Sequence, residues 1–502
     1  MQGSRLITVG FDAELRPFIF QVLLAGLAGV IAYRRFFHPL RDIPGPPLAS
    51  VSRLWHIYHI LKGDQNLALI ELHEKRGPFI RLAHNEVSVS HPDGIRKVLL
   101  TPLRKAPWYE MAAIPDYRFQ TPMSTTDPKK KVERSRTFAA GYSLTNVLRN
   151  EAAIDSVIYL FLDHLEGFSA SQTPCHLDKF FTFTAFDVIG EVLFSQRFGF
   201  LEKGKDVGNA VANSLALNAY AAVAGFFLII HRTLIANPLV TWLNILPFGH
   251  LFDTTVQALD KRLKDKRDDS MFDSVEHWFR ALEKDPERVK LRDVYAIATG
   301  AVGAASDTVS CGMQAFVYFM IRRKGAWEKA REEIKRAQQE EGRCKDKVVS
   351  FADAQKLPYL QACLKEAMRV FAPVPMTLPR VAGKEGVAIG GRYFPPGTIL
   401  SINPWVVHHS AEIWGQDAKE FRPERWLEEN AKELERWFMA FGQGYQSCPG
   451  QHIARIEMSK IAATLVRDYD IEQVDPKKNW EWVAYFTVVP ESWPVYIKSR
   501  TT

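Results

Sequence analysis

The stretch FGQGYQSCPG, residues 441–450, places a single cysteine, Cys448, among three glycines and a proline. The next residues, 451–466, repeat apolar side chains at helical spacing, so Cys448 is expected just before a helix N-terminus. Unpaired N–H groups and the helix dipole at such an end stabilise a thiolate. The glycines permit unusual backbone angles and let a flat ligand approach the chain closely. Together these features suit a thiolate that ligates a large planar cofactor.

Three other roles for Cys448 are less favoured: a zinc ligand, a nucleophile and a structural thiol. A zinc site would need three further ligands, and the nearest candidate is His452 alone. His452 is also the nearest partner for a Cys–His nucleophile, but a helix would carry its ring away from the open side of the sulfur. A purely structural thiol would not require the glycines.

A second candidate site is the pair Asp307 and Thr308, which follows a run of small residues in ATGAVGAASDTVS, 298–310. This run lies within a predicted helix over 291–320, about 45 Å long at roughly 1.5 Å per residue. Small side chains would let a bulky group lie against the helix. Taken alone, the pair is better explained by a Thr308 hydroxyl that bonds the carbonyl four residues earlier and an Asp307 that faces water.

A third constellation is a carboxylate with two guanidinium groups. Glu366 and Arg369 share one face of a predicted helix over 356–371, where side chains three apart can pair. Arg425, in the proline-bracketed FRPERW, could complete a buried Glu–Arg–Arg cluster. Surface pairs of this kind are common and weak, so the spacing alone indicates little.

The elements that must position these groups are mostly helices. Helical periodicity runs over 151–167, 326–341 and 356–371, whereas 79–90 and 387–402 show strand alternation or turn signals. Hydrophobic residues make up 47% of the chain and charged residues 24%, which is typical of a folded protein with a large core. The sequence therefore predicts a mainly α fold with small β-sheets (α+β).

The spacing of the five cysteines and the net charge of +7 limit the possible functions. No C-x-x-C pair indicates a disulfide framework or a cysteine-rich zinc site. No arginine-rich run or nucleic-acid motif accompanies the positive charge, so nucleic acid is not an expected partner. The densest basic patch, DPKKKVERSR at 127–136, is either a solvated helix face or a docking patch.

The N-terminus predicts a membrane anchor over residues 1–37. Residues 18–33 are apolar but short of the roughly 20 residues of a usual span. Arginines follow the apolar run, which places that side in the cytosol, and acidic residues precede it, which disfavours the alternative of a cleaved signal peptide. Four prolines in 38–50 predict an extended hinge, so that 51–502 forms the folded body.

A second apolar stretch, 215–246, favours a buried or membrane-touching helix pair. It is interrupted by Asn218, His231, Arg232 and Pro238, which argues against a second span. Plain hydrophobic core is the alternative, with about equal weight.

The stretches at 298–310, 356–371, 421–426 and 441–450 together make the chain resemble the cytochrome P450 superfamily of haem-thiolate monooxygenases. The family's cysteine loop, F-x-x-G-x-R-x-C-x-G, is matched by Phe441, Gly444, Cys448 and Gly450 in register. Its E-x-x-R motif is matched by Glu366 and Arg369, its P-E-R-F motif by residues 423–426 with Trp426 for phenylalanine, and its A/G-G-x-D/E-T pattern by residues 304–308 with Ala305 for glycine. KAPWYE (105–110), FAAGYS (138–143) and NPWVVHHS (403–410) are most similar to fungal pisatin-demethylase-like members of secondary metabolism.

The resemblance implies a P450 fold, haem b as cofactor and a role for each matched residue. Cys448 would be the axial ligand to the haem iron. Asp307 and Thr308 would deliver protons during oxygen activation. Glu366, Arg369 and Arg425 would hold the cysteine loop, and Arg380 matches an arginine that commonly binds a haem propionate.

Two departures concern how the haem is held. The loop arginine that usually pairs with a propionate is Gln446 here, which can donate a hydrogen bond but carries no charge. The W/H-x-x-x-R pattern that often serves the other propionate is missing from KKKVERSRTF at 129–138, where Arg134 or Arg136 are the candidates. Haem affinity would fall unless other basic residues compensate.

The implied activity is insertion of one oxygen atom from O₂ into an apolar small molecule. Electrons would come from NADPH through a separate NADPH–cytochrome P450 reductase, steered by the patch at 127–136. The expected location is the endoplasmic reticulum membrane, single-pass, with a cytosolic catalytic domain. The alternatives are a haem-thiolate isomerase or dehydratase that does not use O₂, and a haem-binding protein without turnover.

Overall fold

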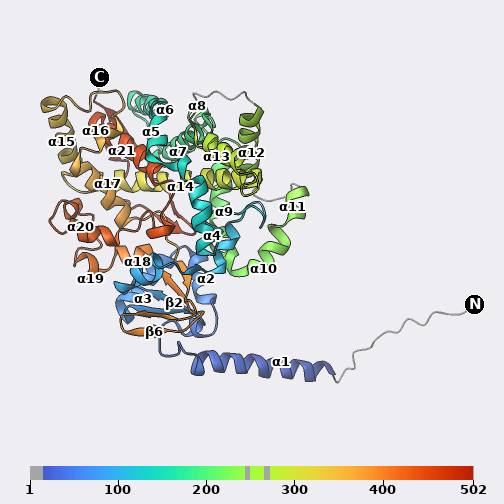
Figure 1. The fold of residues 1–502 in the computed structure, drawn as a ribbon. Helices are drawn as coiled ribbons and strands as arrows, with labels where there is room; N and C mark the ends of the chain where they lie inside the picture. Colours follow the sequence, from blue (N-terminus) through green and yellow to red (C-terminus); the bar gives the residue numbers. More distant parts are fainter. Residues whose placement is uncertain (1–14, 244–248, 265–271, 501–502) are drawn as a thin grey trace, which may run out of the picture.

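The computed structural model describes residues 15–243, 249–264 and 272–500, and its body is built mainly of helices (Figure 1). The sheets that contain β2 (Glu86–Val89) and β6 (Arg392–Phe394) lie at one side of the body, next to α1 (Leu15–Ala32), which runs apart from it. The C-terminus lies at the opposite end. The predicted fold class, mainly α with small β-sheets, is confirmed.

The centre of the body is α14 (Leu291–Arg322), whose 32 residues span about 48 Å at roughly 1.5 Å per residue. Its first turn is closed by the Asp293 carboxylate, which accepts the Lys290 backbone N–H at 2.9 Å. The helices that contact α14 are α7 (Leu177–Phe194), α12 (Gly249–Lys264), α13 (Ser274–Lys284), α15 (Ala326–Glu340), α17 (Pro358–Val370) and α21 (Gln451–Asp468). The helix predicted over 291–320 is therefore the element against which most of the body packs.

The remaining helices surround this centre. They are α2 (Leu54–Lys62), α3 (Gln65–Arg76), α4 (Pro128–Phe138), α5 (Leu144–Arg149), α6 (Glu151–Ser171), α8 (Phe200–Lys203), α9 (Ala210–Ala224), α10 (Leu228–Ile230), α11 (Pro238–Leu243), α16 (Phe351–Ala354), α18 (Pro404–His408), α19 (Ala411–Trp414) and α20 (Ala431–Leu434). The helices predicted over 151–167, 326–341 and 356–371 are confirmed as α6, α15 and α17. Pro358 stands at the first position of α17, where its missing N–H costs nothing.

The main sheet has five strands in the order β1-β2-β7-β4-β3. Its strands are β1 (Phe79–Ala83), β2 (Glu86–Val89), β3 (Arg104–Lys105), β4 (Leu378–Val381) and β7 (Ile399–Ile402), and only the β2–β7 pair is parallel. Three antiparallel pairs complete the described strands: β5 (Val387–Ile389) with β6 (Arg392–Phe394), β8 (Tyr469–Gln473) with β11 (Val495–Ser499), and β9 (Trp482–Ala484) with β10 (Val488–Pro490). The strand signals at 79–90 and 387–402 are confirmed.

The segment predicted as an extended hinge, 38–50, is instead folded onto the sheet. Leu40 and Ile43 are buried in the same apolar cluster as the strand residues Val87 and Leu400. The Pro44 carbonyl accepts the Arg81 N–H of β1 at 2.8 Å. The prolines prevent a long helix, as expected, but burial of the apolar side chains between them fixes the segment to the body.

Two apolar helical segments have the length and composition of a membrane span. The segment Pro17–Phe37 covers α1 and the turn η1 (Tyr33–Phe37), and none of its most apolar window is buried. The segment Ala210–Ile235 is 28% buried over its window, so it packs partly against the body. Beyond α9 the large side chains of Ile229, Leu234 and Trp242 are exposed. The end of the predicted 215–246 region, at 244–246, lies outside the described residues.

Candidate functional site

The cysteine loop is a tight turn that depends on two glycines. Gly442 and Gly444 have φ of +67° and +61°, a region that residues with a side chain rarely adopt. Gly444 begins the 3-10 turn η10 (Gly444–Gln446), and a Cβ there would lie 2.9 Å from the Leu100 side chain. The turn closes where the Cys448 N–H donates to the Phe441 carbonyl at 2.8 Å. The loop backbone is therefore fixed on both sides of the cysteine.

The Cys448 side chain is exposed, and α21 begins three residues after it. Burial of the thiol by the surrounding protein raises its pKa, while the backbone N–H groups of Gly450 and Gln451 lower it. Because the net direction is upward, the helix N-terminus does not by itself keep the thiol ionised, which corrects the expectation from sequence. A cation at the sulfur would supply the missing stabilisation of the thiolate.

A zinc site gains no support. Within the described ranges, no three His, Cys, Asp or Glu side chains lie close enough together to hold a metal ion. Gly450 instead leaves room beside the sulfur, because a Cβ there would lie 3.9 Å from Cys448 Sγ. Protein ligation through the one sulfur, with the remaining ligands from a cofactor, fits this arrangement.

The polar pair on α14 is held by a residue that the sequence did not indicate. The Ser214 hydroxyl, on α9, donates to Asp307 Oδ2 at 2.7 Å. Burial raises the pKa of Asp307, whereas hydrogen bonds from Ser214 and Ser306 lower it. Thr308 Oγ1 donates to the Ala304 carbonyl at 2.9 Å, as local geometry predicts. Asp307 is therefore positioned by the helix that lies across it.

Ala304 is exposed although it stands in the middle of α14. An exposed alanine at the centre of a helix that crosses the core requires open space beside it. Ala304 belongs to the same small-residue run that leads to Asp307 and Thr308. Open space beside the run of small residues is consistent with the bulky group that the run predicted.

The structure brings Glu366, Arg369 and Arg425 together at 0 to 1% exposure. Glu366 accepts Arg369 Nε at 2.9 Å and Nη2 at 2.8 Å, and it accepts Arg425 Nε at 2.9 Å. Trp426 Nε1, in place of the family's phenylalanine, donates to Glu366 Oε2 at 2.9 Å. One carboxylate thus meets two guanidinium groups and an indole, and Asp417 lies 3.3 Å from Arg425 as a second acid.

This charge cluster is connected to the cysteine loop through His408. Arg369 donates to the backbone carbonyl of His408, and the ring Nε2 of His408 accepts the Met439 N–H at 2.8 Å. Burial, followed by the charge of Arg369, holds the pKa of His408 well below its ordinary value, which keeps the ring neutral and able to accept. Two residues separate Met439 from the start of the Gly442 turn. The predicted role of the cluster, to hold the loop, has a continuous set of contacts behind it.

Three buried cations near the loop have no acidic side chain among their recorded partners. Arg380 donates to the Tyr109 hydroxyl at 3.0 Å and its Nε has no partner. Lys105 Nζ donates to the carbonyls of Pro122 at 2.8 Å and Met123 at 2.6 Å. Lys131 donates to the Tyr445 carbonyl. Burial, and then the charge of Arg380, lower the pKa of Lys105 to about 6 and that of Lys131 to about 8.

Besides these cations, Gln446 is a further donor whose hydrogen bond is not made. Its Nε2 is buried without a partner. Orphaned donors beside uncompensated positive charges indicate that an anion completes the site. The two carboxylates of a haem are such anions, so the residues present fit the group that the sequence resemblance implies. Lys105 and Lys131 were missed because a lysine is normally a surface residue, and Lys131 also stands in a basic patch.

The two other arginines considered for this task lie differently. Arg134 donates to the Gln120 carbonyl and lies 3.8 Å from the Asp293 carboxylate. Arg136 is exposed. Neither contacts the three cations, so Lys131, which lies one helical turn before Arg134, takes the position toward the loop.

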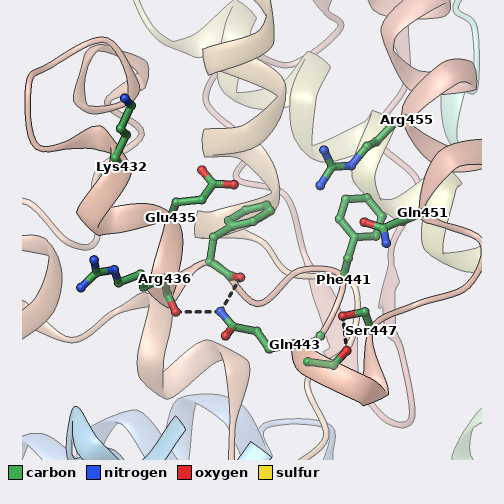
Figure 2. A pocket seen from close by; sticks show the side chains of 11 residues that line it. Lys432, Glu435, Arg436, Phe441, Gln443, Ser447, Gln451 and Arg455 are labelled. Carbon is green, nitrogen blue, oxygen red and sulfur yellow. Dashed lines mark hydrogen bonds between the residues drawn. The ribbon is translucent and has the colours of Figure 1, made fainter. Parts of the chain in front are cut away.

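A cavity of about 360 Å³ lies beside the cysteine loop (Figure 2). Figure 2 shows Phe441, Gln451 and Arg455 on one side of it and Lys432 and Arg436 on the other. The Arg455 guanidinium lies 5.1 Å from the centre of the Phe441 ring. The only acid that lines the cavity, Glu435, is paired with Lys365. The side of the cysteine loop on which this cavity lies is therefore positively charged.

Comparison with known proteins agrees with this geometry. Residues 44–492 match the family model described as Cytochrome P450. The chain is 30% identical over 488 residues to the cytochrome P450 monooxygenase gsfF of Penicillium aethiopicum, covering 93% of this chain and 96% of that protein. It is 29% identical over 483 residues to pisatin demethylase of Fusarium vanettenii, covering 93% and 90%. It is 30% identical over 488 residues to the cytochrome P450 monooxygenase hepC of Aspergillus oryzae, covering 92% and 94%.

The charge cluster predicts unequal costs for its members. Glu366→Gln leaves two buried guanidinium groups without their carboxylate, so we expect the free energy of unfolding to fall by about 3–5 kcal/mol. Trp426→Phe removes one hydrogen bond to a charged group, with an expected loss of about 1.5–3 kcal/mol. Urea unfolding followed by circular dichroism measures both. Glu71→Gln, which removes an exposed pair with Lys75, is the control and should not change the midpoint. Equal losses for Glu366→Gln and Glu71→Gln would contradict a structural role.

Proposed function

The chain belongs to the cytochrome P450 family, and we propose that it is a haem-thiolate monooxygenase of fungal secondary metabolism that inserts one oxygen atom from O₂ into an apolar small molecule. The observation that carries this proposal is Cys448, exposed at the head of α21 in the family's register. The haem, when bound, supplies oxygen binding and the redox chemistry that splits the O–O bond. Hydroxylation, epoxidation and demethylation all fall within this reaction class.

The acid–alcohol pair favours oxygen activation over the two alternatives. Asp307 is a half-buried acid whose pKa is raised by burial, the direction that favours a proton-carrying role, and Thr308 is the next residue on α14. An isomerase or dehydratase that starts from a preformed peroxide has no need for this pair. A non-catalytic haem carrier has no need for it either, and Gln446, the residue that favours a carrier, is offset by nearby lysines.

In this proposal Lys105, Lys131, Arg380 and Gln446 would hold the haem carboxylates. The two lysines supply the positive charge that Gln446 lacks, and Gln446 contributes a neutral donor. An anion would raise the lysine pKa values back toward their ordinary range, so binding of the haem and protonation of the lysines favour each other. This offsets the weaker haem affinity that the Gln446 substitution implies.

The substrate is apolar in this proposal because of the side chains that gather over the opening. Segments predicted to line the pocket mouth, 105–125 and 215–246, meet in one apolar cluster that contains Trp108, Met111 and Ala222. The Trp108 indole donates to the Ala222 carbonyl at 3.2 Å, which joins the two segments. A mostly apolar wall with few polar groups is typical of a small-molecule site.

The proposed location is the endoplasmic reticulum membrane, with α1 as a single span and the body in the cytosol. The exposed apolar side chains of α10 and α11 support a second, peripheral contact with the lipid surface. NADPH–cytochrome P450 reductase is the proposed electron donor. It would dock on the positively charged side of the cysteine loop, because an electron delivered there has the shortest path through the loop to the sulfur. Lys129 and Lys130 are exposed on α4 and would assist steering.

The function is tested by spectroscopy and turnover. We expect the reduced, CO-treated protein to show the red-shifted absorption band of thiolate-ligated haem, and Cys448→Ala to abolish it. Cys175→Ala, at a buried cysteine of the core, is the matched control and should keep the band. Product formation from the precursor that accumulates in a deletion strain should require both NADPH and O₂. Turnover without O₂ would instead support the isomerase or dehydratase.

The lysine contribution to haem binding is tested with two neighbouring residues of α4. Lys131→Met removes a buried charge, whereas Lys130→Met removes an exposed one. Loss of a charge-assisted hydrogen bond should speed haem transfer to apomyoglobin about ten- to hundredfold for Lys131→Met, with no change for Lys130→Met. With haem dimethyl ester, which has no carboxylates, the two variants should behave alike. A persistent difference would mean that Lys131 only supports the Tyr445 carbonyl.

Ser214 is expected to act as a positioning residue for Asp307. Ser214→Ala removes a hydrogen bond that favours the charged carboxylate, so the pKa of Asp307 should rise further. The pH dependence of coupling, measured as hydrogen peroxide released per NADPH consumed, should move to higher pH, with a loss of coupling of about two- to tenfold. Ser214→Thr keeps the hydroxyl and should restore the wild-type profile. An unchanged profile in Ser214→Ala would mean that the contact is only structural.

A further inference from the structure

A basic cavity lies where the N-terminal anchor meets the body. It has a volume of about 290 Å³ and lies between the residues that follow η1, the folded proline segment at 43–47 and strand β1. Four arginines line it, and they come from three separate parts of the chain: Arg35, Arg41, Arg76 and Arg81. None of these residues belongs to the cysteine loop or to the walls of the proposed haem site.

Arg81 is buried in the wall of this cavity with hydrogen bonds unmade. The side chain is 2% exposed. Its Nη2 donates to the carbonyls of Arg34 at 3.1 Å and His84 at 2.7 Å. Its Nε and Nη1 have no partner. A guanidinium that is buried with two of its donor groups unpaired is costly unless a ligand completes it.

Among the described residues that line the cavity, no acidic side chain is free to balance the arginines. Its one acidic lining residue, Asp42, is paired with Arg392 at 2.7 Å. Arg41 and Arg76 donate to backbone carbonyls, of Phe36 at 3.3 Å and Gly45 at 3.0 Å, which carry no charge. The charge of Arg81 also acts on His38, whose pKa is lowered by burial and then by Arg81 and Arg34.

We propose that this cavity binds a phosphate group. The planar guanidinium fork, with paired N–H donors, matches phosphate oxygens better than an ammonium does, which explains why the lining cations are arginines and not lysines. The cavity begins at Arg35, within the last turn of the apolar segment Pro17–Phe37, so a spanning α1 places it at the depth of lipid headgroups. A phospholipid headgroup and a free phosphorylated molecule share this chemistry, and the position beside the anchor favours the lipid.

The test uses the full-length protein in phosphatidylcholine nanodiscs with and without phosphatidic acid. The phosphatidic acid that stays bound after detergent exchange is measured by mass spectrometry, relative to phosphatidylcholine. We expect enrichment in the wild-type protein and a loss of at least about tenfold in Arg41→Gln/Arg76→Gln, whose side chains are exposed and not required for the core. Lys477→Gln/Lys498→Gln, two exposed residues near the C-terminus, has the same net charge and should retain the enrichment.

A second arm separates the two sources of phosphate. Lipid-stripped protein in detergent is titrated with inorganic phosphate and with glycerol 3-phosphate, and thermal unfolding is followed. Stabilisation by the soluble ligands, lost in the arginine variant, without enrichment of phosphatidic acid would assign the cavity to a free phosphorylated molecule. If neither arm distinguishes the arginine variant from the lysine control, the cavity binds no phosphate and the proposal fails.

Discussion

The Glu366 carboxylate is the interaction on which the geometry of the cysteine loop depends. It joins α17 to the turn that carries Arg425 and Trp426, and Arg369 continues the connection to His408 and the loop. A buried ion pair is weak as a source of net stability, because desolvation offsets much of the attraction. The cluster matters because hydrogen bonds are directional. Each of them is satisfied in one geometry only, so the cluster holds the loop in a single position.

Helical periodicity and motif register were sufficient to predict the main helices, the strand regions and the cluster of Glu366, Arg369 and Arg425. The predictions that failed concern burial. The prolines of 38–50 exclude a long helix, as predicted, but the segment forms turns and a 3-10 helix at Pro47–Ser50, and nothing in the pattern indicates that Leu40 and Ile43 enter the core. Ser214 could not be assigned either, since it lies 93 residues from Asp307 and a serine on an apolar helix carries no signal of its own.

The lysines at 129–131 also show that burial could not be predicted from the sequence. KKK at 129–131 reads as one basic patch, yet helical phase exposes the first two residues and buries Lys131. No composition rule distinguishes them, because the difference depends on what α4 packs against. Gln446 was the one visible sign, since a missing loop arginine requires positive charge from elsewhere. The sequence thus predicted that compensation was needed, and the three-dimensional contacts supply the residues.

Buried charge is used in two opposite ways in this fold. Around Glu366 the charges are compensated within the protein, so the cluster is complete before any ligand binds. Around Lys105, Lys131 and Arg380, and again around Arg81, the recorded partners are carbonyls and hydroxyls, which satisfy hydrogen bonds but leave the charge unbalanced. A folded state that carries such charges is stabilised by any anion that binds it in preference to the unfolded chain. Stability and ligand occupancy are therefore linked at these positions, whereas at Glu366 stability depends on the protein alone.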